Sequence, residues 1–158
     1  MQRMVIRAAG VGLILILGIA AIIFFNARSS LAEDLNNAET LLHAEADIES
    51  VNNVSYYFGE DAVYTAEITN TEGENEWVFI RNEEIEERLP EQQSLKRSEA
   101  EELVKETFDL QKVRSVKPGY EQGEPIYEIT CEKDNRLHFY YMNLKNGEFI
   151  KRYSMKQS

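Results

Sequence analysis

The residues of this chain that could perform chemistry are few, and none stands at a spacing that catalysis requires. His43 and His138 are the two histidines, and neither has a partner at the His-x3-His spacing of a metal site. Cys131 is the single cysteine, so no disulfide can form within the chain. It lies in an alternating apolar run, which favours a small buried side chain over a reactive thiol.

An acidic run at residues 83–87 carries four glutamates whose carboxylates could hold calcium. The run lacks the glycine turn and the fixed ligand spacing of a calcium loop, so a solvated acidic face is the favoured interpretation. The chain also lacks a nucleophile elbow, a Walker loop and a Ser-x-x-Lys motif. We therefore expect a protein that is not an enzyme, with no metal, no cofactor and no small-molecule substrate.

The elements that position these residues begin with a helix and a three-stranded meander. We expect strands at residues 51–58, 62–69 and 76–81, where the apolar pattern has a period of two. Together with the preceding helix they form a first module at residues 29–82. The apolar face of that helix is predicted by spacings of three and four residues, at Leu31, Leu35, Ala38 and Leu42.

A second module follows an acidic, glutamine-rich linker at residues 83–97, which Pro90 interrupts. Its helix begins at the capping-box pattern Ser98-Glu99-Ala100-Glu101 and ends near Phe108. This module occupies residues 98–158. Its predicted strands lie at 110–117, 125–132, 136–143 and 148–153, with a loop marked by Pro118-Gly119 and Gly123 and a hairpin turn at Asn146-Gly147.

The second half of the chain repeats the first at an offset of 61 positions. Glu67-Ile68-Thr69 falls on Glu128-Ile129-Thr130, and Phe79 falls on Tyr140. The order helix, strand, strand, strand matches, and a period of two makes the matching of strand faces informative. We infer an α+β fold with two tandem modules, each a helix packed on an antiparallel sheet of three to four strands.

One helix covers only one face of each sheet, so the opposite faces need another contact. In the first module Ala66, Ile68, Val78 and Ile80 are expected to face the helix. The candidate partner-binding residues project from the other faces, and they are Trp77, Phe79, His138 and Tyr140. The alternative is that these side chains pack between the two modules, in which case a Trp77→Ala substitution unfolds the chain.

The longest apolar run, Ala8–Phe25, contains no charge and no amide. As a helix it spans roughly 27 Å, about the thickness of a bilayer's hydrocarbon core. Arg3 and Arg7 precede it, which predicts a cytoplasmic N-terminus and an extracytoplasmic body. We expect a cytoplasmic end and transmembrane anchor at residues 1–28. The helix can continue outward as a stalk, or Ser29 or Ser30 can cap a new helix. The alternative is a signal peptide cleaved near Ser30-Leu31-Ala32.

The remainder of the chain is acidic, and the formal net charge of the whole is −11. Such a surface repels nucleic acid, so nucleic acid is excluded as a partner. Hydrophobic residues make up 43% of the chain, which is enough for a packed core without disulfides.

This plan resembles the TseB (YpmB) family of Firmicute cell-wall elongation regulators, whose ectodomain has two PepSY-like modules. The likeness rests on the anchor and on four stretches, which are residues 64–69, 76–80, 98–101 and 140–148. The resemblance implies a non-catalytic, single-pass cell-membrane protein with an extracytoplasmic domain that binds a class B penicillin-binding protein. The alternative is a PepSY-type inhibitor of an extracytoplasmic protease, or an accessory protein of a sensor kinase.

Overall fold

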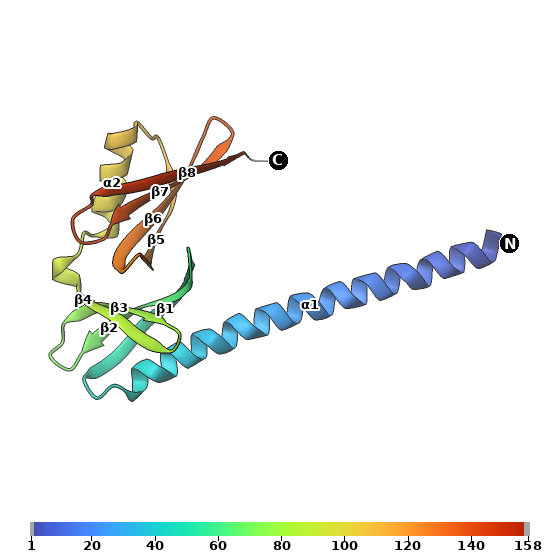
Figure 1. The fold of residues 1–158 in the computed structure, drawn as a ribbon, viewed down its shortest axis with the longest axis horizontal. Helices are drawn as coiled ribbons and strands as arrows, with labels where there is room; N and C mark the ends of the chain where they lie inside the picture. The colour runs from blue at the N-terminus through green and yellow to red at the C-terminus, as the bar shows by residue number, and fades with distance from the viewer. Residues whose placement is uncertain (1, 157–158) are drawn as a thin grey trace. The chain divides into compact units, whose positions relative to one another are not determined.

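The computed structural model describes the backbone of residues 2–156, and the side chains of residues 16–20, 22–24 and 31–156. Two compact units divide the chain, Met1–Asn37 and Ala38–Ser158. Helix α1 (Gln2–Ala44) supplies the first unit and the first element of the second (Figure 1). Of the two alternatives that the sequence left open, the continuous helix is therefore the observed one.

No helix in the part of the chain that the structure describes is both long and apolar enough to cross a membrane. The predicted anchor, Ala8–Phe25, lies largely outside the residues whose side chains are described.

The first sheet contains four antiparallel strands in the order β1-β2-β3-β4. They are β1 (Ile48–Phe58), β2 (Ala62–Asn70), β3 (Asn75–Arg81) and β4 (Glu84–Pro90). The three predicted strands are present within a few residues of their expected ends.

The fourth strand corrects the sequence analysis, because β4 occupies residues that were expected to be linker. Asn82 and Glu83 both have positive φ, 51° and 62°, and so form the tight turn that joins β3 to β4. The turn has no glycine, and β4 is rich in acidic residues because it is an exposed edge strand. The sequence of β4 therefore has neither the turn residues nor the apolar alternation by which a strand is usually predicted. Only the short 3-10 helix η1 (Glu91–Gln93) and a few flanking residues connect the two modules.

The face of the first sheet toward α1 is the one that the sequence predicts. Ala38 and Leu42 of α1 pack there, at 5% and 0% exposure. Their partners are the predicted sheet residues Ala66, Ile68, Val78 and Ile80. The period of two in β2 and β3 fixes this face because successive side chains must point to opposite sides.

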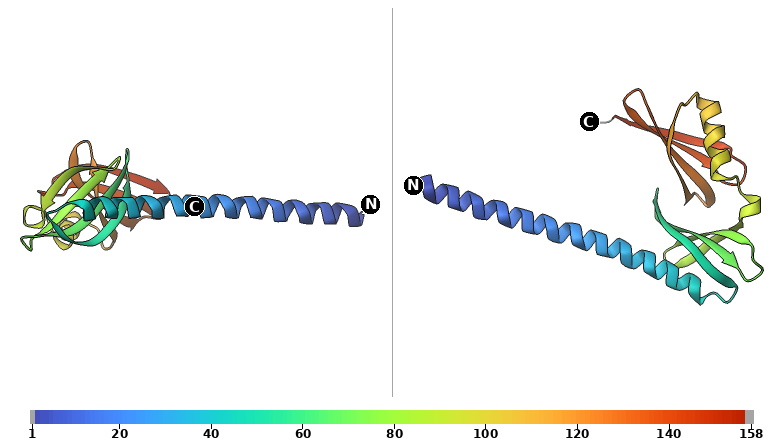
Figure 2. Two further views of the ribbon diagram at one scale, coloured as in Figure 1. Left: turned by 90° about the horizontal axis from the view of Figure 1, so that it is seen from below. Right: turned by 180° about the vertical axis from the view of Figure 1, so that it is seen from behind.

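The second module contains α2 (Arg97–Phe108) and a second antiparallel sheet in the order β5-β6-β7-β8 (Figures 1 and 2). Its strands are β5 (Val113–Glu121), β6 (Glu124–Lys133), β7 (Arg136–Asn143) and β8 (Phe149–Lys156). Helix α2 is capped at Lys96, one residue before its first turn, and Glu99 accepts the Lys96 N–H at 2.9 Å. The capping box predicted at Ser98 is therefore wrong, because Ser98 lies inside the helix, and the observed contact at the helix start is the one between Lys96 and Glu99.

The expected loop begins too early, since Pro118 and Gly119 both lie within β5 and, of the residues that marked it, Gly123 is the one in the turn. The actual turn is Gln122-Gly123, where both residues have positive φ, 53° and 82°. Proline is tolerated in β5 because this strand is at the edge of its sheet and needs no hydrogen bond from every N–H.

The internal repeat holds for β2 and β6 but not for the strands that pair with them. Glu67 is opposite Trp77 in the first sheet, whereas Glu128 is opposite Tyr141 in the second. Relative to the 61-residue repeat, β7 is therefore displaced by three further residues along its partner β6. Because this shift is an odd number, the side chains that the repeat matches between β3 and β7 point to opposite faces of their sheets. The structural equivalent of Trp77 is Tyr141, not His138.

Candidate functional site

Trp77 and Phe79, the predicted partner-binding pair, are buried at the junction of the two modules. Trp77 is 6% exposed and Phe79 is fully buried. The Arg97 guanidinium lies 5.2 Å from the centroid of the Trp77 ring, and the Tyr120 ring lies 5.4 Å from that of Phe79. Both partners belong to the second module, so Trp77 and Phe79 form no exposed patch, and of the two interpretations of the sequence the packing between modules is the observed one.

Tyr140 and His138 do not join that junction, because the inverted register turns them toward α2. The Tyr140 ring lies 4.5 Å from that of Phe108 at the end of α2, and Tyr140 is 2% exposed. His138 is half-buried, 6.3 Å from Tyr140 between ring centroids, and its Nε2 lies 3.3 Å from the Lys133 carbonyl oxygen. The structure therefore does not bring the four predicted residues together into one surface.

The second sheet meets the first module through a residue that the sequence analysis did not single out, Tyr57 of β1. Its ring lies directly on Gly119 of β5, where an added Cβ would be 2.6 Å from the Tyr57 Cγ. The Tyr57 hydroxyl donates to Glu121 Oε1 at 2.6 Å, and Lys151 of β8 pairs with the other oxygen of Glu121. The available sequence signal for this contact was an aromatic residue near the end of a predicted strand.

Burial keeps two tyrosine hydroxyls of this junction, those of Tyr57 and Tyr141, in the protonated form. Desolvation first, and then the hydrogen bond to Glu121, raise the pKa of Tyr57 far above its ordinary value. The pKa of Tyr141 is also raised, first by burial and then by the hydrogen bond that its hydroxyl donates to Glu128 at 2.8 Å. Both phenols stay protonated and donate to carboxylates, which suits a structural contact and not acid–base chemistry.

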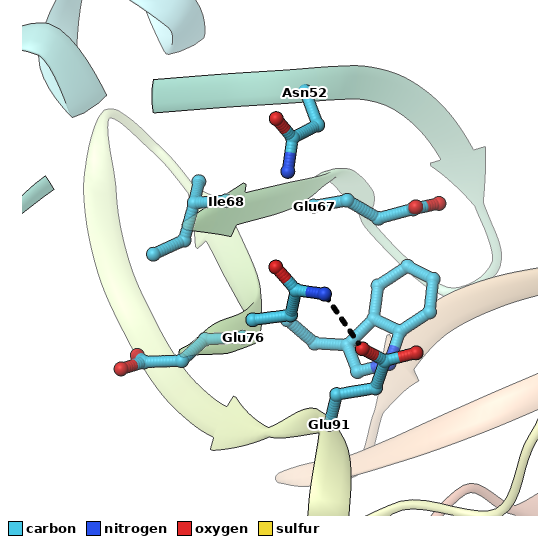
Figure 3. Close-up of a pocket in the computed structure, with 7 residues that line it drawn as sticks. Asn52, Glu67, Ile68, Glu76 and Glu91 are labelled. Atoms are coloured by element: carbon cyan, nitrogen blue, oxygen red, sulfur yellow. Dashed lines mark hydrogen bonds between the residues drawn. The ribbon is translucent and has the colours of Figure 1, made fainter. Parts of the chain in front are cut away.

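A small cavity of about 80 Å³ lies beside Trp77 (Figure 3). In the close-up Asn52, Glu67, Glu76 and Glu91 surround it, contributed by β1, β2, β3 and η1. This volume is well below that of an ordinary small-molecule site, which is several hundred Å³.

The carboxylates around this cavity are already paired within the chain. Glu67 pairs with Arg97, and Glu76 accepts from Arg88 Nε at 2.9 Å. Glu91 accepts from the Asn75 side chain at 3.0 Å (Figure 3). No group of three metal-ligating side chains occurs among the residues that the structure describes. The cavity is therefore a polar gap beside the module junction.

The largest collection of exposed apolar side chains in unit Ala38–Ser158 lies on β8. Four of its eight residues are 44–59% exposed apolar or aromatic side chains, namely Phe149, Ile150, Tyr153 and Met155. Elsewhere in the described part of this unit, the large apolar side chains with comparable exposure are Phe58 and Leu103. Concentrated exposed apolar surface is typical of a protein-binding region, so β8 is the candidate functional site.

The comparisons with known proteins agree with this fold. Residues 95–153 match the PepSY family, described as the peptidase propeptide and YPEB domain. This range covers α2, β5, β6 and β7 and most of β8. A sequence comparison with curated proteins found no significant match.

Two solved structures resemble the chain. The YpmB protein from Bacillus subtilis has a TM-score of 0.68 at 18% identity, over 75% of this chain and 94% of that chain. The protein CD1622 from Clostridium difficile 630 has a TM-score of 0.41 at 15% identity, over 72% of this chain and 85% of that chain. The family match and the fold of YpmB confirm the predicted resemblance to a YpmB-like protein with a PepSY domain.

Proposed function

We propose, from the PepSY domain at residues 95–153 and the YpmB-like fold, that this chain is a non-catalytic binding protein of the cell envelope. Its function is to regulate cell-wall elongation by contacting a class B penicillin-binding protein. The observation that carries the proposal is the PepSY module itself, which presents exposed apolar side chains on β8. PepSY domains are protein-interaction modules that are typically non-catalytic, which supports action through contact.

The proposal includes a membrane tether, with the N-terminus in the cytoplasm and unit Ala38–Ser158 outside. Supporting it, the described apolar side chains of α1 between residues 16 and 24 are exposed, at 58–65%. The arginines before this run and the acidic chain after it match the charge bias of such an orientation. Adding protease to intact cells with permeabilised walls should then degrade the second unit and spare the N-terminal end.

A second candidate function is supported by the description of the matched family, which includes peptidase propeptides. In that case the chain inhibits an extracytoplasmic protease, or assists a sensor kinase. The two candidates differ in the class of protein that is bound.

The deciding experiment purifies the full-length chain from detergent-solubilised membranes of the cells that produce it, after mild crosslinking. Mass spectrometry should find a class B penicillin-binding protein enriched over a control that contains only residues 1–37. Enrichment of a protease or a sensor kinase instead would support the second candidate. A sample in which none of these classes exceeds the control contradicts both.

A further inference from the structure

Strand β8 is the outermost strand of its sheet. The sheet order β5-β6-β7-β8 pairs one edge of β8 with β7, and no described strand pairs with the other edge. An open edge presents a row of backbone N–H and C=O groups that can accept an additional strand. Long open edges invite unwanted pairing unless they are interrupted or protected by charge.

The two faces of β8 carry different chemistry. Arg152 lies opposite Tyr140, 5.8 Å from the ring centroid, and so belongs to the face covered by α2. By alternation Ser154 and Lys156 lie on that same face. Tyr153 and Met155 lie on the opposite face, where they are 56% and 59% exposed.

The charge of β8 is opposite to that of the chain as a whole. The strand carries Lys151, Arg152 and Lys156 and no acidic residue, in a chain with a net charge of −11. Lys151 is already paired with Glu121, whereas Arg152 and Lys156 are exposed. Along residues 152–156, a strand added beside β8 thus meets Arg152 and Lys156 on one face and Tyr153 and Met155 on the other. Lys151 also lies on the face of Tyr153, where Glu121 holds it.

We propose that the open edge of β8 binds an extended segment of a partner protein in which acidic residues alternate with apolar ones. The segment adds a fifth strand to the second sheet, with its carboxylates beside Arg152 and Lys156 and its apolar side chains beside Tyr153 and Met155. Backbone hydrogen bonds supply the pairing, and the alternation supplies the specificity. This inference rests on the proposed function, because it names the surface and the partner chemistry of that binding.

A second copy of the chain fits this edge less well. Pairing β8 with another β8 would place two strands of positive charge side by side, and like charges on neighbouring strands are destabilising. An acidic partner segment removes that repulsion. Self-association through β8 is therefore an outcome that would contradict the proposal.

The test uses the isotope-labelled full-length chain in detergent micelles and synthetic peptides as long as β8. One peptide alternates glutamate and valine, and a second has the same composition in two blocks. Nuclear magnetic resonance should show amide shifts and slowed amide exchange along Phe149–Lys156 with the alternating peptide. We expect the block peptide to bind at least about fivefold more weakly, because it cannot place its acids on one face.

Matched variants locate the site. Lys156→Glu should weaken the alternating peptide by about fivefold or more, whereas Lys112→Glu makes the same charge change on an exposed residue outside β8 and should not. Tyr153→Ser should also weaken binding, and Phe58→Ser, on the 68% exposed Phe58 of β1, should not. Amide spectra that change only near each substituted residue show that each variant is folded.

Three outcomes would overturn the inference: shifts that avoid β8, equal binding of the two peptides, or concentration-dependent dimers whose amide shifts fall along Phe149–Lys156 without any peptide. None of these bears on the crosslinking result, which identifies the bound protein without regard to the surface used. Capture of a class B penicillin-binding protein that is unaffected by Lys156→Glu and Tyr153→Ser would retain the proposed function and reject β8.

Discussion

Gly119 shows how one missing side chain allows the two modules to meet. The Tyr57 ring occupies the space that a Cβ at position 119 would need, and Tyr57 is only 3% exposed. Its hydroxyl also holds Glu121, which in turn pairs with Lys151 of β8. A single aromatic contact thus connects the first sheet to both edge strands of the second.

We predict that Gly119→Ala lowers the free energy of unfolding by about 1–3 kcal/mol, because the added methyl group overpacks the Tyr57 ring. Denaturant unfolding of the full-length chain in micelles measures this. Lys117→Ala, on an exposed residue of the same strand, should change stability by less than about 0.5 kcal/mol. Combining Gly119→Ala with Tyr57→Leu should cost less than the sum of the single changes, and strict additivity would argue against the contact.

Cys131 illustrates a side chain whose role follows from burial alone. It is fully buried, and burial raises the pKa of its thiol. A raised pKa means that less of the reactive thiolate is present at any given pH.

We therefore predict that Cys131 does not react with a thiol reagent such as Ellman's reagent at mildly alkaline pH until the chain unfolds. In denaturant the same thiol should react completely within minutes. Rapid labelling of the native protein would show that the β6 face toward α2 opens, contrary to the packing described.

At the scale of elements, β4 is held by a turn in an unfavourable backbone conformation. Glu83 has a φ of 62°, which costs a residue with a side chain about 1 kcal/mol or more relative to glycine. The strand forms because Leu89, at 3% exposure, adds to the core between the modules. Tertiary packing therefore compensates for weak local sequence preference.

Replacing Glu83 with glycine should raise stability by up to about 1 kcal/mol, since glycine adopts this φ without strain. The thermal unfolding midpoint should rise. Glu84→Gly, one residue later inside β4, is the matched control and should lower it, because glycine weakens a strand interior. A midpoint that falls for both variants would mean that the turn is not strained.

For unit Ala38–Ser158 as a whole, the important feature is one large core to which both sheets contribute. Trp77, Phe79 and Leu89 of the first sheet share a cluster with Tyr127 and Val104 of the second module. A second, smaller core lies between α1 and the first sheet. The modules are separate as sheets, yet Trp77, Phe79 and Leu89 of the first sheet are buried in a core that the second module completes.

This shared core predicts that both sheets unfold in a single transition. Trp77→Ala should lower the free energy of unfolding by about 3–5 kcal/mol, with the loss of both sheets at the same denaturant concentration. Because Trp77 is the sole tryptophan, this substitution removes tryptophan fluorescence as a probe. Circular dichroism and amide exchange therefore follow the unfolding of the two sheets. Phe58→Ala, on an exposed residue, should change stability by less than about 0.5 kcal/mol. Loss of the first sheet alone would contradict the shared core.

From the sequence alone, the order of the elements except β4 could be predicted, and so could the face of the first sheet that meets α1. Ala66, Ile68, Val78 and Ile80 could be assigned because the period of a strand is a local property. The same alternation placed Trp77 and Phe79 on the opposite face. The hairpin signal Asn146-Gly147 located the final strand, which became the candidate site.

The tertiary structure alone decided what covers each face. Burial of Trp77 depends on Arg97, and burial of Phe79 depends on Tyr120, both distant in the chain. The three-residue offset between the sheets depends on which residues pair across strands, and a local pattern does not contain that information. Alternation along a strand fixes which side chains share a face, whereas the partner of that face is set by contacts between residues far apart in sequence.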